Sequence, residues 1–312
     1  MTFDCLNFLG SKRKPFLFIC DFKAQNLEII CADKLKENDI EFSIDADFIY
    51  EKHDFVLKKT SFDFDDYKEK FKKVIRKIKA GETYLLNLTK PTSVQTTLSL
   101  KEIYKYANAH YKLRYKDEFV CFSPEKFIEL KESKIHTYPM KGTIDASILD
   151  AKDKILNNQK EMAEHIMVVD LLRNDLSIVA KNIKVEDFRY VQKIQAGQKK
   201  LLQVSSHISG DVGNDWHNRV GDILKALLPA GSISGTPKKS TLEIIDEVER
   251  YDRGHFSGVF GFYDGESLDS GVMIRFIEKT KNGYIYKSGG GITLDSDARS
   301  EYDELLDKIY LP

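Results

Sequence analysis

The chain has 312 residues, 42% of them hydrophobic and 31% charged, and its 48 Lys and Arg residues almost balance its 49 Asp and Glu residues. The net charge of -1 argues against a dedicated nucleic-acid-binding protein, because phosphate contacts require a surplus or a stripe of basic side chains. A small anionic ligand remains compatible with this balance, since it needs only a few local cations.

The cysteines and the apolar segments indicate a cytoplasmic protein that makes no contact with a membrane. Cys5, Cys20, Cys31 and Cys121 are unclustered and have no histidine at ligand spacing, so we expect reduced packing residues rather than disulfides or a zinc site. No apolar run approaches the ~20 residues that a bilayer requires. The N-terminus places apolar residues before basic ones, which is the opposite of a signal peptide.

Short apolar runs between polar breaks predict antiparallel strands in the first sixty residues, at 15–22, 27–32, 39–44 and 55–60. A helix capped by Ser61 or Asp63 is expected next, because apolar residues recur at steps of three and four over 67–78. Gly81 is expected to end that helix.

The rest of the chain alternates between both kinds of element. Strands are expected at 83–89, 119–130, 134–138, 183–194, 199–210, 256–264, 271–279 and 283–288. Helices are expected at 100–110, 158–179, 214–228, 236–248 and 297–310. Since there is no internal repeat and no proline-rich linker, we expect a single α+β unit over 1–312 rather than two domains.

The segment 138–143 contains a lysine, Lys141, between a proline and a glycine at the end of an expected strand. A desolvated lysine becomes a neutral amine and hence a nucleophile. Glu125, which follows Ser123 and Pro124, is a candidate acid/base partner for it. The alternative is an exposed lysine in a turn.

Two carboxylate couples, Glu161 with Glu164 and Glu301 with Glu304, have i,i+3 spacing on expected helices, so each couple shares one face. Two such faces brought together provide oxygen ligands for a hard cation such as Mg²⁺. The alternative is that both couples are solvated surface.

Two glycine-containing segments are candidate anion sites. Residues 228–239 place Gly231 and Gly235 before an expected helix, with Pro237 in its first turn, Ser234 or Thr236 as its cap, and Lys238 close by. The run 289–291 is three successive glycines, which favours a backbone nest for a carboxylate. The alternatives are a capped helix after a glycine turn and a flexible turn.

In this order, the segments resemble the chorismate-utilising enzyme family, which includes anthranilate, aminodeoxychorismate, isochorismate and salicylate synthases. The resemblance runs from about residue 64 to 309, so we expect a shortened, strand-rich N-terminal part at 1–63 and a family core at 64–312. Its motifs are GETYLLNLT (81–89), SPEKF (123–127), PMKGT (139–143), EMAEHIMVVDLLRNDL (161–176), LPAGSISGTPK (228–238), RGHFSGVFGF (253–262), VMIRF (272–276) and GGGITLDSDARSEYDELLDK (289–308).

The resemblance implies two mostly antiparallel β-sheets packed as a sandwich with flanking helices, and a site for chorismate between them. It implies Mg²⁺ as the cofactor, with Glu164, Glu301 and Glu304 as ligands and Glu161 as an outer partner. The implied substrate-binding residues are Gly289, Gly290, Gly291, Lys238 and Ser234 for the ring carboxylate, Arg275 for the enolpyruvyl carboxylate, and Thr143.

Lys141 and Leu85 bear on the reaction. By resemblance, a lysine in the PMKGT segment marks the aminodeoxychorismate synthase component I branch. There it attacks ring C2 while the C4 hydroxyl leaves with help from Glu125, and ammonia then adds at C4. The product, 4-amino-4-deoxychorismate, leads to p-aminobenzoate and folate. Leu85 stands where isochorismate and salicylate synthases have a water-activating lysine, which disfavours that branch.

Three departures from the family pattern weigh on the alternatives. Gln203 stands where anthranilate synthases have a catalytic histidine, with His207 four residues on; Phe256 replaces a tyrosine that often touches a carboxylate; and Leu85 replaces the usual glutamine. Anthranilate synthase component I and a non-catalytic paralogue that binds an anion or a partner remain alternatives.

The source of ammonia is open as well. We find no glutaminase Cys-His-Glu set and no fused lyase after the last helix, so ammonia is expected from solution or from a separate glutamine amidotransferase subunit. The shortened N-terminal part leaves open whether such a subunit docks.

Overall fold

The computed structural model describes residues 2–45, 56–60, 63–196 and 199–311. Two β-sheets form the centre of the molecule, and every strand pairing among these residues is antiparallel. Leu17 and Ile19 of one sheet pack against Phe119, Cys121 and other apolar side chains of the second sheet. This arrangement confirms the expected α+β sandwich.

The nine-stranded sheet has its strands in the order β10 (Met140–Asp145), β12 (Lys199–Asp211), β9 (Lys134–Thr137), β8 (Lys126–Lys131), β15 (Leu268–Val272), β14 (Val259–Tyr263), β1 (Phe16–Cys20), β2 (Leu27–Cys31), with β11 (Lys181–Ala196) also paired to β12. The eight-stranded sheet has the order β13 (Gly235–Thr236), β5 (Leu85–Thr96), β17 (Gly283–Ile292), β16 (Phe276–Thr280), β7 (Phe119–Ser123), β6 (Tyr111–Tyr115), β3 (Ile40–Ile44), with β4 (Leu57–Lys59) paired to β5.

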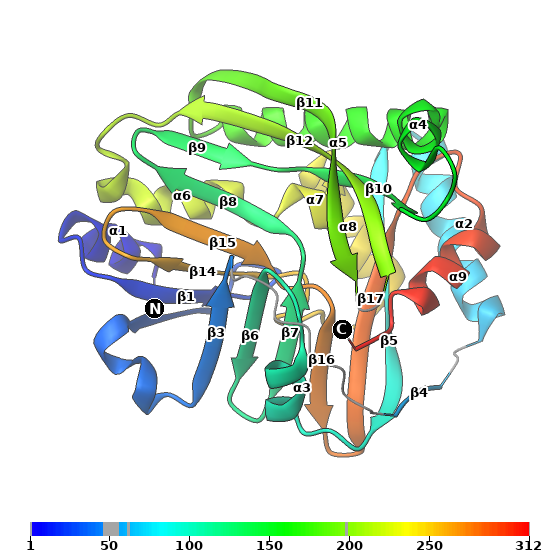
Figure 1. The fold of residues 1–312 in the computed structure, drawn as a ribbon, viewed down its shortest axis with the longest axis horizontal. Helices are drawn as coiled ribbons and strands as arrows, with labels where there is room; N and C mark the ends of the chain where they lie inside the picture. Colours follow the sequence, from blue (N-terminus) through cyan, green and yellow to red (C-terminus); the bar gives the residue numbers. More distant parts are fainter. Residues whose placement is uncertain (1, 46–55, 61–62, 197–198, 312) are drawn as a thin grey trace.

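Helices flank both sheets (Figure 1). On the nine-stranded sheet lie α1 (Phe3–Ser11), α5 (Gln159–Ser177) and α6 (Val220–Leu227), together with the 3₁₀ helix η2 (Trp216–Arg219). On β5 and β17 lie α2 (Phe64–Lys79), α8 (Lys238–Glu249) and α9 (Ala298–Asp307). Also present are α3 (Leu100–Tyr106), α4 (Ala151–Asn157), α7 (Gly231–Ser234) and η1 (Ala32–Glu37).

Strand β1 shows why each sheet packs against helices on one face and against the other sheet on its opposite face. Successive side chains of a strand point to opposite faces. Accordingly, Phe16 and Phe18 face α1 and α6, whereas Leu17 and Ile19 face the second sheet. All five residues of β1 are buried, as expected for a strand covered on both faces. β1 and β3, both from the N-terminal part, are strands of the two central sheets. The expected division into an N-terminal part at 1–63 and a family core at 64–312 stays a prediction.

Two segments that we expected to be single strands, 119–130 and 271–279, each cross from one sheet to the other. β7 ends at Ser123 and β8 begins at Lys126 in the other sheet, since Pro124 has no N–H with which to continue the ladder. β15 ends at Val272 and β16 begins at Phe276 in the other sheet, directly after Arg275, whose φ is +51°. Hydrogen bonds join the two crossings, from the Val272 N–H to the Glu125 carbonyl (3.0 Å) and from the Phe122 N–H to the Arg275 carbonyl (3.2 Å).

Other expectations also need correction. α1 lies in a segment for which we expected no helix. Pro237 precedes α8 as its N-cap instead of lying in its first turn, and neither Ser234 nor Thr236 caps that helix. The cap of α2 is Asp63, whose side chain accepts the Asp65 N–H, while the other expected cap, Ser61, lies outside the described residues. Residue 55 of the strand expected at 55–60 also lies outside them.

The described helices include none with the length and apolar character that crossing a lipid bilayer demands.

A buried ion pair fastens the end of α8 to β5. The Arg253 guanidinium donates to both carboxylate oxygens of Glu249, at 2.8 and 2.7 Å, and each side chain is 1% exposed. It also donates to the carbonyl oxygens of Ile233 and Asn87, while Glu249 accepts the Thr89 N–H at 2.7 Å. Removing one partner therefore leaves the other as an uncompensated buried charge.

We predict that Arg253→Met lowers the free energy of unfolding by about 3–5 kcal/mol, measured by urea denaturation. The control is Arg299→Met, which removes an exposed guanidinium paired to Asp303 at 3.1 Å on α9 and should cost less than about 1 kcal/mol. Equal losses in the two variants would contradict the importance of the buried pair.

Candidate active site

Lys141 lies on β10 at an irregularity in the pairing with β12, between Met140 and Thr143. Gly142 makes that irregularity possible, because its φ is +85° and a Cβ there would lie 3.1 Å from Glu161 Oε2. Lys141 Nζ lies 3.9 Å from Glu164 Oε2 and 3.5 Å from the place where a Cβ on Gly291 would be. The amine therefore lies among β10, α5 and β17.

His165 of α5 lies next to the backbone of Lys141. Its side chain is fully buried on α5, and Nε2 is 2.7 Å from Ser206 Oγ on β12. Burial, with a smaller effect from Arg189, lowers the pKa of His165 to about 4, so the imidazole is neutral at pH 7. The Lys141 backbone also acts on the pKa of His165, so this side of α5 lies close to β10 at the residue that bears the amine.

The structure brings the two carboxylate couples together. Glu161 and Glu164 lie on α5, and Glu301 and Glu304 lie on α9. Glu301 is only 5% exposed and accepts a hydrogen bond from Ser296 Oγ at 2.9 Å. Burial, and then the neighbouring carboxylates, raise the pKa of Glu161 and of Glu301.

Lys160 lies between the two helices, a residue that the sequence analysis did not single out. Its Nζ is 3.8 Å from Glu164 Oε1 and 4.0 Å from Glu301 Oε1. Its sequence position could have indicated this, because Lys160 lies next to Glu161 and four residues before Glu164, which places Lys160 and Glu164 on one face of a helix.

The donor chemistry of this cluster suits a hard cation, although no coordination sphere is assembled. Nowhere in the described part of the chain do three His, Cys, Asp or Glu side chains come close enough to hold a metal ion. The ligand atoms are all carboxylate oxygens, which Mg²⁺ prefers. Burial, and after it the neighbouring carboxylates, raises the pKa of Glu161 and of Glu301, and a divalent cation would offset both effects. The magnesium assignment stays a prediction.

The three glycines at 289–291 are extended rather than a nest, which corrects the sequence expectation. They continue β17 and pair with 87–89 of β5. A Cβ on Gly289 would lie 2.5 Å from Thr89 Cγ2, so close strand packing requires this glycine. Gly290 instead faces Glu301 and Lys308, whose nearest side-chain atoms would lie 3.3 and 3.8 Å from a Cβ there.

Lys308 is a cation of the site that the sequence analysis missed. Its Nζ donates to the Gly289 carbonyl at 2.9 Å and lies 2.7 Å from Glu304 Oε1. Burial lowers the pKa of Lys308. Its i,i+4 spacing from Glu304, inside a motif already identified, was the available signal.

Glu125 and Arg275 lie at the two sheet crossings. The Ser232 hydroxyl of α7 donates a short hydrogen bond to Glu125 Oε1. Burial raises the pKa of Glu125, although Ser232 and the charges of Lys141, Arg275 and Lys308 oppose that rise. The crossings therefore place one carboxyl group, with a tendency to stay protonated, within the influence of three cations.

Three predicted site residues have other surroundings. Lys238 Nζ is 3.1 Å from Asp175 Oδ2 and donates to the Leu227 carbonyl at 3.0 Å. The buried Ser234 hydroxyl donates to the Ala230 carbonyl at 2.9 Å. Thr143 is exposed, opposite Gln203 on β12. The first two polar groups are thus engaged in packing among α5–α8, and the substrate-binding roles of all three stay predictions.

His207 lies away from Lys141. Its Nε2 is 3.0 Å from His136 Nδ1, and its ring stacks on Tyr138 with centroids 4.7 Å apart. The imidazole is thus held by β9 and its continuation, and a catalytic role for His207 has no contact to support it.

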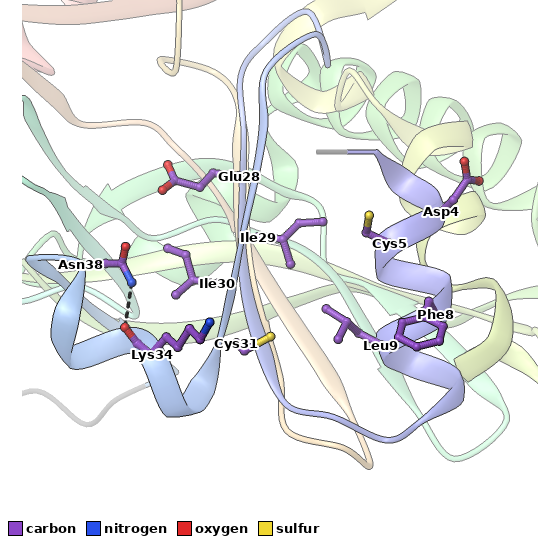
Figure 2. Close-up of a pocket in the computed structure, with 10 residues that line it drawn as sticks. All are labelled: Asp4, Cys5, Phe8, Leu9, Glu28, Ile29, Ile30, Cys31, Lys34 and Asn38. Carbon is purple, nitrogen blue, oxygen red and sulfur yellow. Dashed lines mark hydrogen bonds between the residues drawn. The ribbon is translucent and has the colours of Figure 1, made fainter.

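A separate cavity of about 590 Å³ lies between α1 and β2, with η1 beside it (Figure 2). Phe8, Leu9 and Ile29 form much of its wall, with Cys5 on α1 and Cys31 on β2. No residue of the predicted active site lines it. The groups capable of chemistry are therefore those gathered around Lys141, on other elements.

Comparisons with known proteins agree with the motifs. Residues 25–311 match the sequence model of a family described as chorismate binding enzyme. An uncharacterized PabA-like protein of Haemophilus influenzae is 45% identical over 98% of this chain and 94% of its own length. Aminodeoxychorismate synthase component 1 of Bacillus subtilis is 30% identical over 80% of this chain, which spans 55% of that longer protein.

Among solved structures, a putative 2,3-dihydroxybenzoate-specific isochorismate synthase, DhbC, from Bacillus anthracis superposes with a TM-score of 0.73 at 18% identity. The superposition covers 98% of this chain and 85% of the other. At this identity the likeness shows the fold alone, and it confirms the expected sandwich.

We predict that the free energy of unfolding falls as the pH drops from 6.5 to about 4, because the unfolded chain protonates His165 in that range and the folded chain does not. His165 contributes up to about 3 kcal/mol to this loss. His136, His217 and His255, whose pKa values desolvation also lowers, add to it. Urea denaturation of His165→Gln across this range should show a shallower slope than the wild type, and an unchanged slope would contradict the assignment.

Proposed function

This chain belongs to the family of chorismate binding enzymes, and we propose that it is an aminodeoxychorismate synthase component I, converting chorismate and ammonia to 4-amino-4-deoxychorismate. The observation that supports this proposal is the placement of Lys141, an amine between Glu164 and the glycines of β17, within the electrostatic influence of Glu125. We propose Lys141 as the nucleophile and Glu125 as the acid of this reaction.

Charge suits the substrate. Chorismate carries two carboxylates, and three cations, Lys141, Arg275 and Lys308, act together on Glu125. Arg275 is proposed to take the enolpyruvyl carboxylate, and Lys308, at the Gly289 carbonyl, is close enough to β17 to assist with the ring carboxylate. The ring would then lie beside the glycines of β17.

The proposed reaction has two displacements. Lys141 first gives its ammonium proton to solvent, to which its side chain is 28% exposed. The amine then forms a bond to ring C2, the ring double bonds shift, and the C4–oxygen bond breaks. Glu125 gives its proton to the departing hydroxyl, which leaves as water. Its raised pKa favours the protonated form that this step needs. Ammonia then adds at C4 and the bond from C2 to the lysine nitrogen breaks, so that Lys141 leaves as the neutral amine. The new ammonium group at C4 gives one proton to the Glu125 carboxylate, which restores the acid.

We propose Mg²⁺ as the cofactor, held by Glu164, Glu301 and Glu304 with Glu161 as an outer partner. When bound, the metal would neutralise the ring carboxylate and withdraw electron density from the ring. Lys160, which now lies between Glu164 and Glu301, would have to move aside. Its side chain is 49% exposed and so is free to rotate into solvent.

The ammonia source and the pathway are proposals as well. We propose that ammonia comes from solution or from a separate glutamine amidotransferase subunit, and that the product serves p-aminobenzoate and folate synthesis in the cytoplasm. The word component in the name of the Bacillus subtilis relative agrees with a second subunit.

We predict that Lys141→Ala lowers aminodeoxychorismate formation by more than about 100-fold, because it removes the nucleophile. The assay contains chorismate, Mg²⁺, ammonium and a lyase that releases p-aminobenzoate. Lys152→Ala, on the exposed face of α4, is the matched control and should retain full activity. Wild-type turnover that Lys141→Ala leaves unchanged would exclude the lysine nucleophile, and pyruvate release without the lyase would instead indicate an anthranilate synthase.

We predict that Glu304→Gln weakens Mg²⁺ binding about tenfold or more, because it removes a charged oxygen ligand from the cluster. Isothermal titration calorimetry with Mg²⁺ measures the loss directly, and the Mg²⁺ dependence of turnover checks it. Glu243→Gln, an exposed glutamate of α8, should leave Mg²⁺ binding unchanged. Equal Mg²⁺ affinity of the wild type and Glu304→Gln would rule out Glu304 as a ligand.

A further inference from the structure

Arg275 has no acidic partner in the described part of the chain. Its Nε donates to Tyr310 Oη at 3.3 Å, and its guanidinium carbon lies 5.3 Å from the centre of the Tyr310 ring. No Asp or Glu of the described residues forms an ion pair with it. Its φ of +51°, which side chains rarely adopt, is fixed where Phe122 binds its carbonyl. The backbone thus holds a cation in place with its terminal nitrogens available to an anion.

Tyr286 of β17 has an unpaired hydroxyl beside this cation. The residue is fully buried, and Oη makes no hydrogen bond with the described residues. The ring packs edge-on against Phe122, with centroids 6.3 Å apart, so the phenol cannot easily turn elsewhere. The charge of Arg275 and the backbone N–H of Tyr310 both act on this hydroxyl, and neither group can accept its proton.

A buried hydroxyl without a partner destabilises a folded protein relative to phenylalanine at the same position. Tyr286 lies in a cluster of apolar side chains, where phenylalanine would fill the same space. Packing therefore does not account for the hydroxyl, whereas a hydrogen bond to a ligand does. Arg275 offers donors only, and Tyr286 Oη adds one more, so the group that would satisfy both is an acceptor with more than one oxygen.

We propose that Tyr286 is a specificity-determining residue whose hydroxyl donates a hydrogen bond to the carboxylate that Arg275 binds. This inference rests on the proposed function, in which Arg275 takes the enolpyruvyl carboxylate of chorismate. The carboxylate has two oxygens and can accept from the guanidinium and the phenol at once. Tyr310, which already engages Nε, orients the guanidinium at the rim of the same site. A ligand without this carboxylate leaves the Tyr286 hydroxyl unpaired and is selected against.

The test is the Tyr286→Phe variant, with chorismate binding measured by isothermal titration calorimetry in the presence of Mg²⁺. We expect the dissociation constant to rise about tenfold or more, since a hydrogen bond to a charged group is lost. The melting temperature of the free variant should equal or exceed that of the wild type, because an unpaired buried hydroxyl has been removed. Tyr284→Phe, on the same face of β17 two residues earlier, is the control and should bind as the wild type does.

A double-mutant cycle with Arg275→Lys shows whether the two residues act on one carboxylate. In the Arg275→Lys background, Tyr286→Phe should weaken binding by less than about threefold, because the carboxylate is no longer held in reach. An unchanged dissociation constant for Tyr286→Phe, or an equal loss in both backgrounds, overturns the proposal.

The proposed function can fail separately. A wild-type protein that binds chorismate but forms no aminodeoxychorismate refutes the proposed reaction, while the binding measurements still judge Tyr286. A wild-type protein that does not bind chorismate overturns both.

Discussion

The structure depends on one pair of hydrogen bonds, those that join the two places where the chain passes from one sheet to the other. The Val272 N–H binds the Glu125 carbonyl, and the Phe122 N–H binds the Arg275 carbonyl. The passage from β7 into β8 therefore lies beside the passage from β15 into β16, and the two are hydrogen-bonded to each other. At this point the chain itself links the two sheets twice. Glu125 and Arg275 are therefore placed by backbone geometry, before any contact of their side chains.

The charged groups of the site are arranged around that junction at a cost that only partners can offset. Burial raises the pKa of Glu125, Glu161 and Glu301 and lowers that of Lys308, so each charge is less favourable than it would be in water. Pairs such as Lys308 with Glu304 offset part of this cost. A dianionic substrate and a divalent cation would offset more, which is the physical reason for proposing chorismate and Mg²⁺ as the ligands of this cluster.

Sequence patterns predicted most elements but missed the feature that builds the site. Periodicity located α2, α5 and α9, because each of these helices repeats apolar residues on one face. It did not divide 119–130 or 271–279, although Pro124 lies at the first crossing, because only pairing with distant strands shows which sheet each half joins. The glycines at 289–291 were misjudged for a related reason. Successive glycines are typical of a turn, but they are also found where a neighbouring strand packs too closely for a side chain, and the local sequence is the same in both cases.

The sequence by itself determined the family, the sandwich and the residue types of the site, since these depend on motifs that are local and in a recognisable order. The tertiary structure alone decided which partner each charged group meets. Lys238 pairs with Asp175, whereas Lys308 binds the Gly289 carbonyl beside the glutamates. The physical reason is that spacing along a helix or strand sets only the face on which a side chain lies. What lies opposite that face depends on elements far away in the chain, and electrostatic energy depends on that distance and on burial.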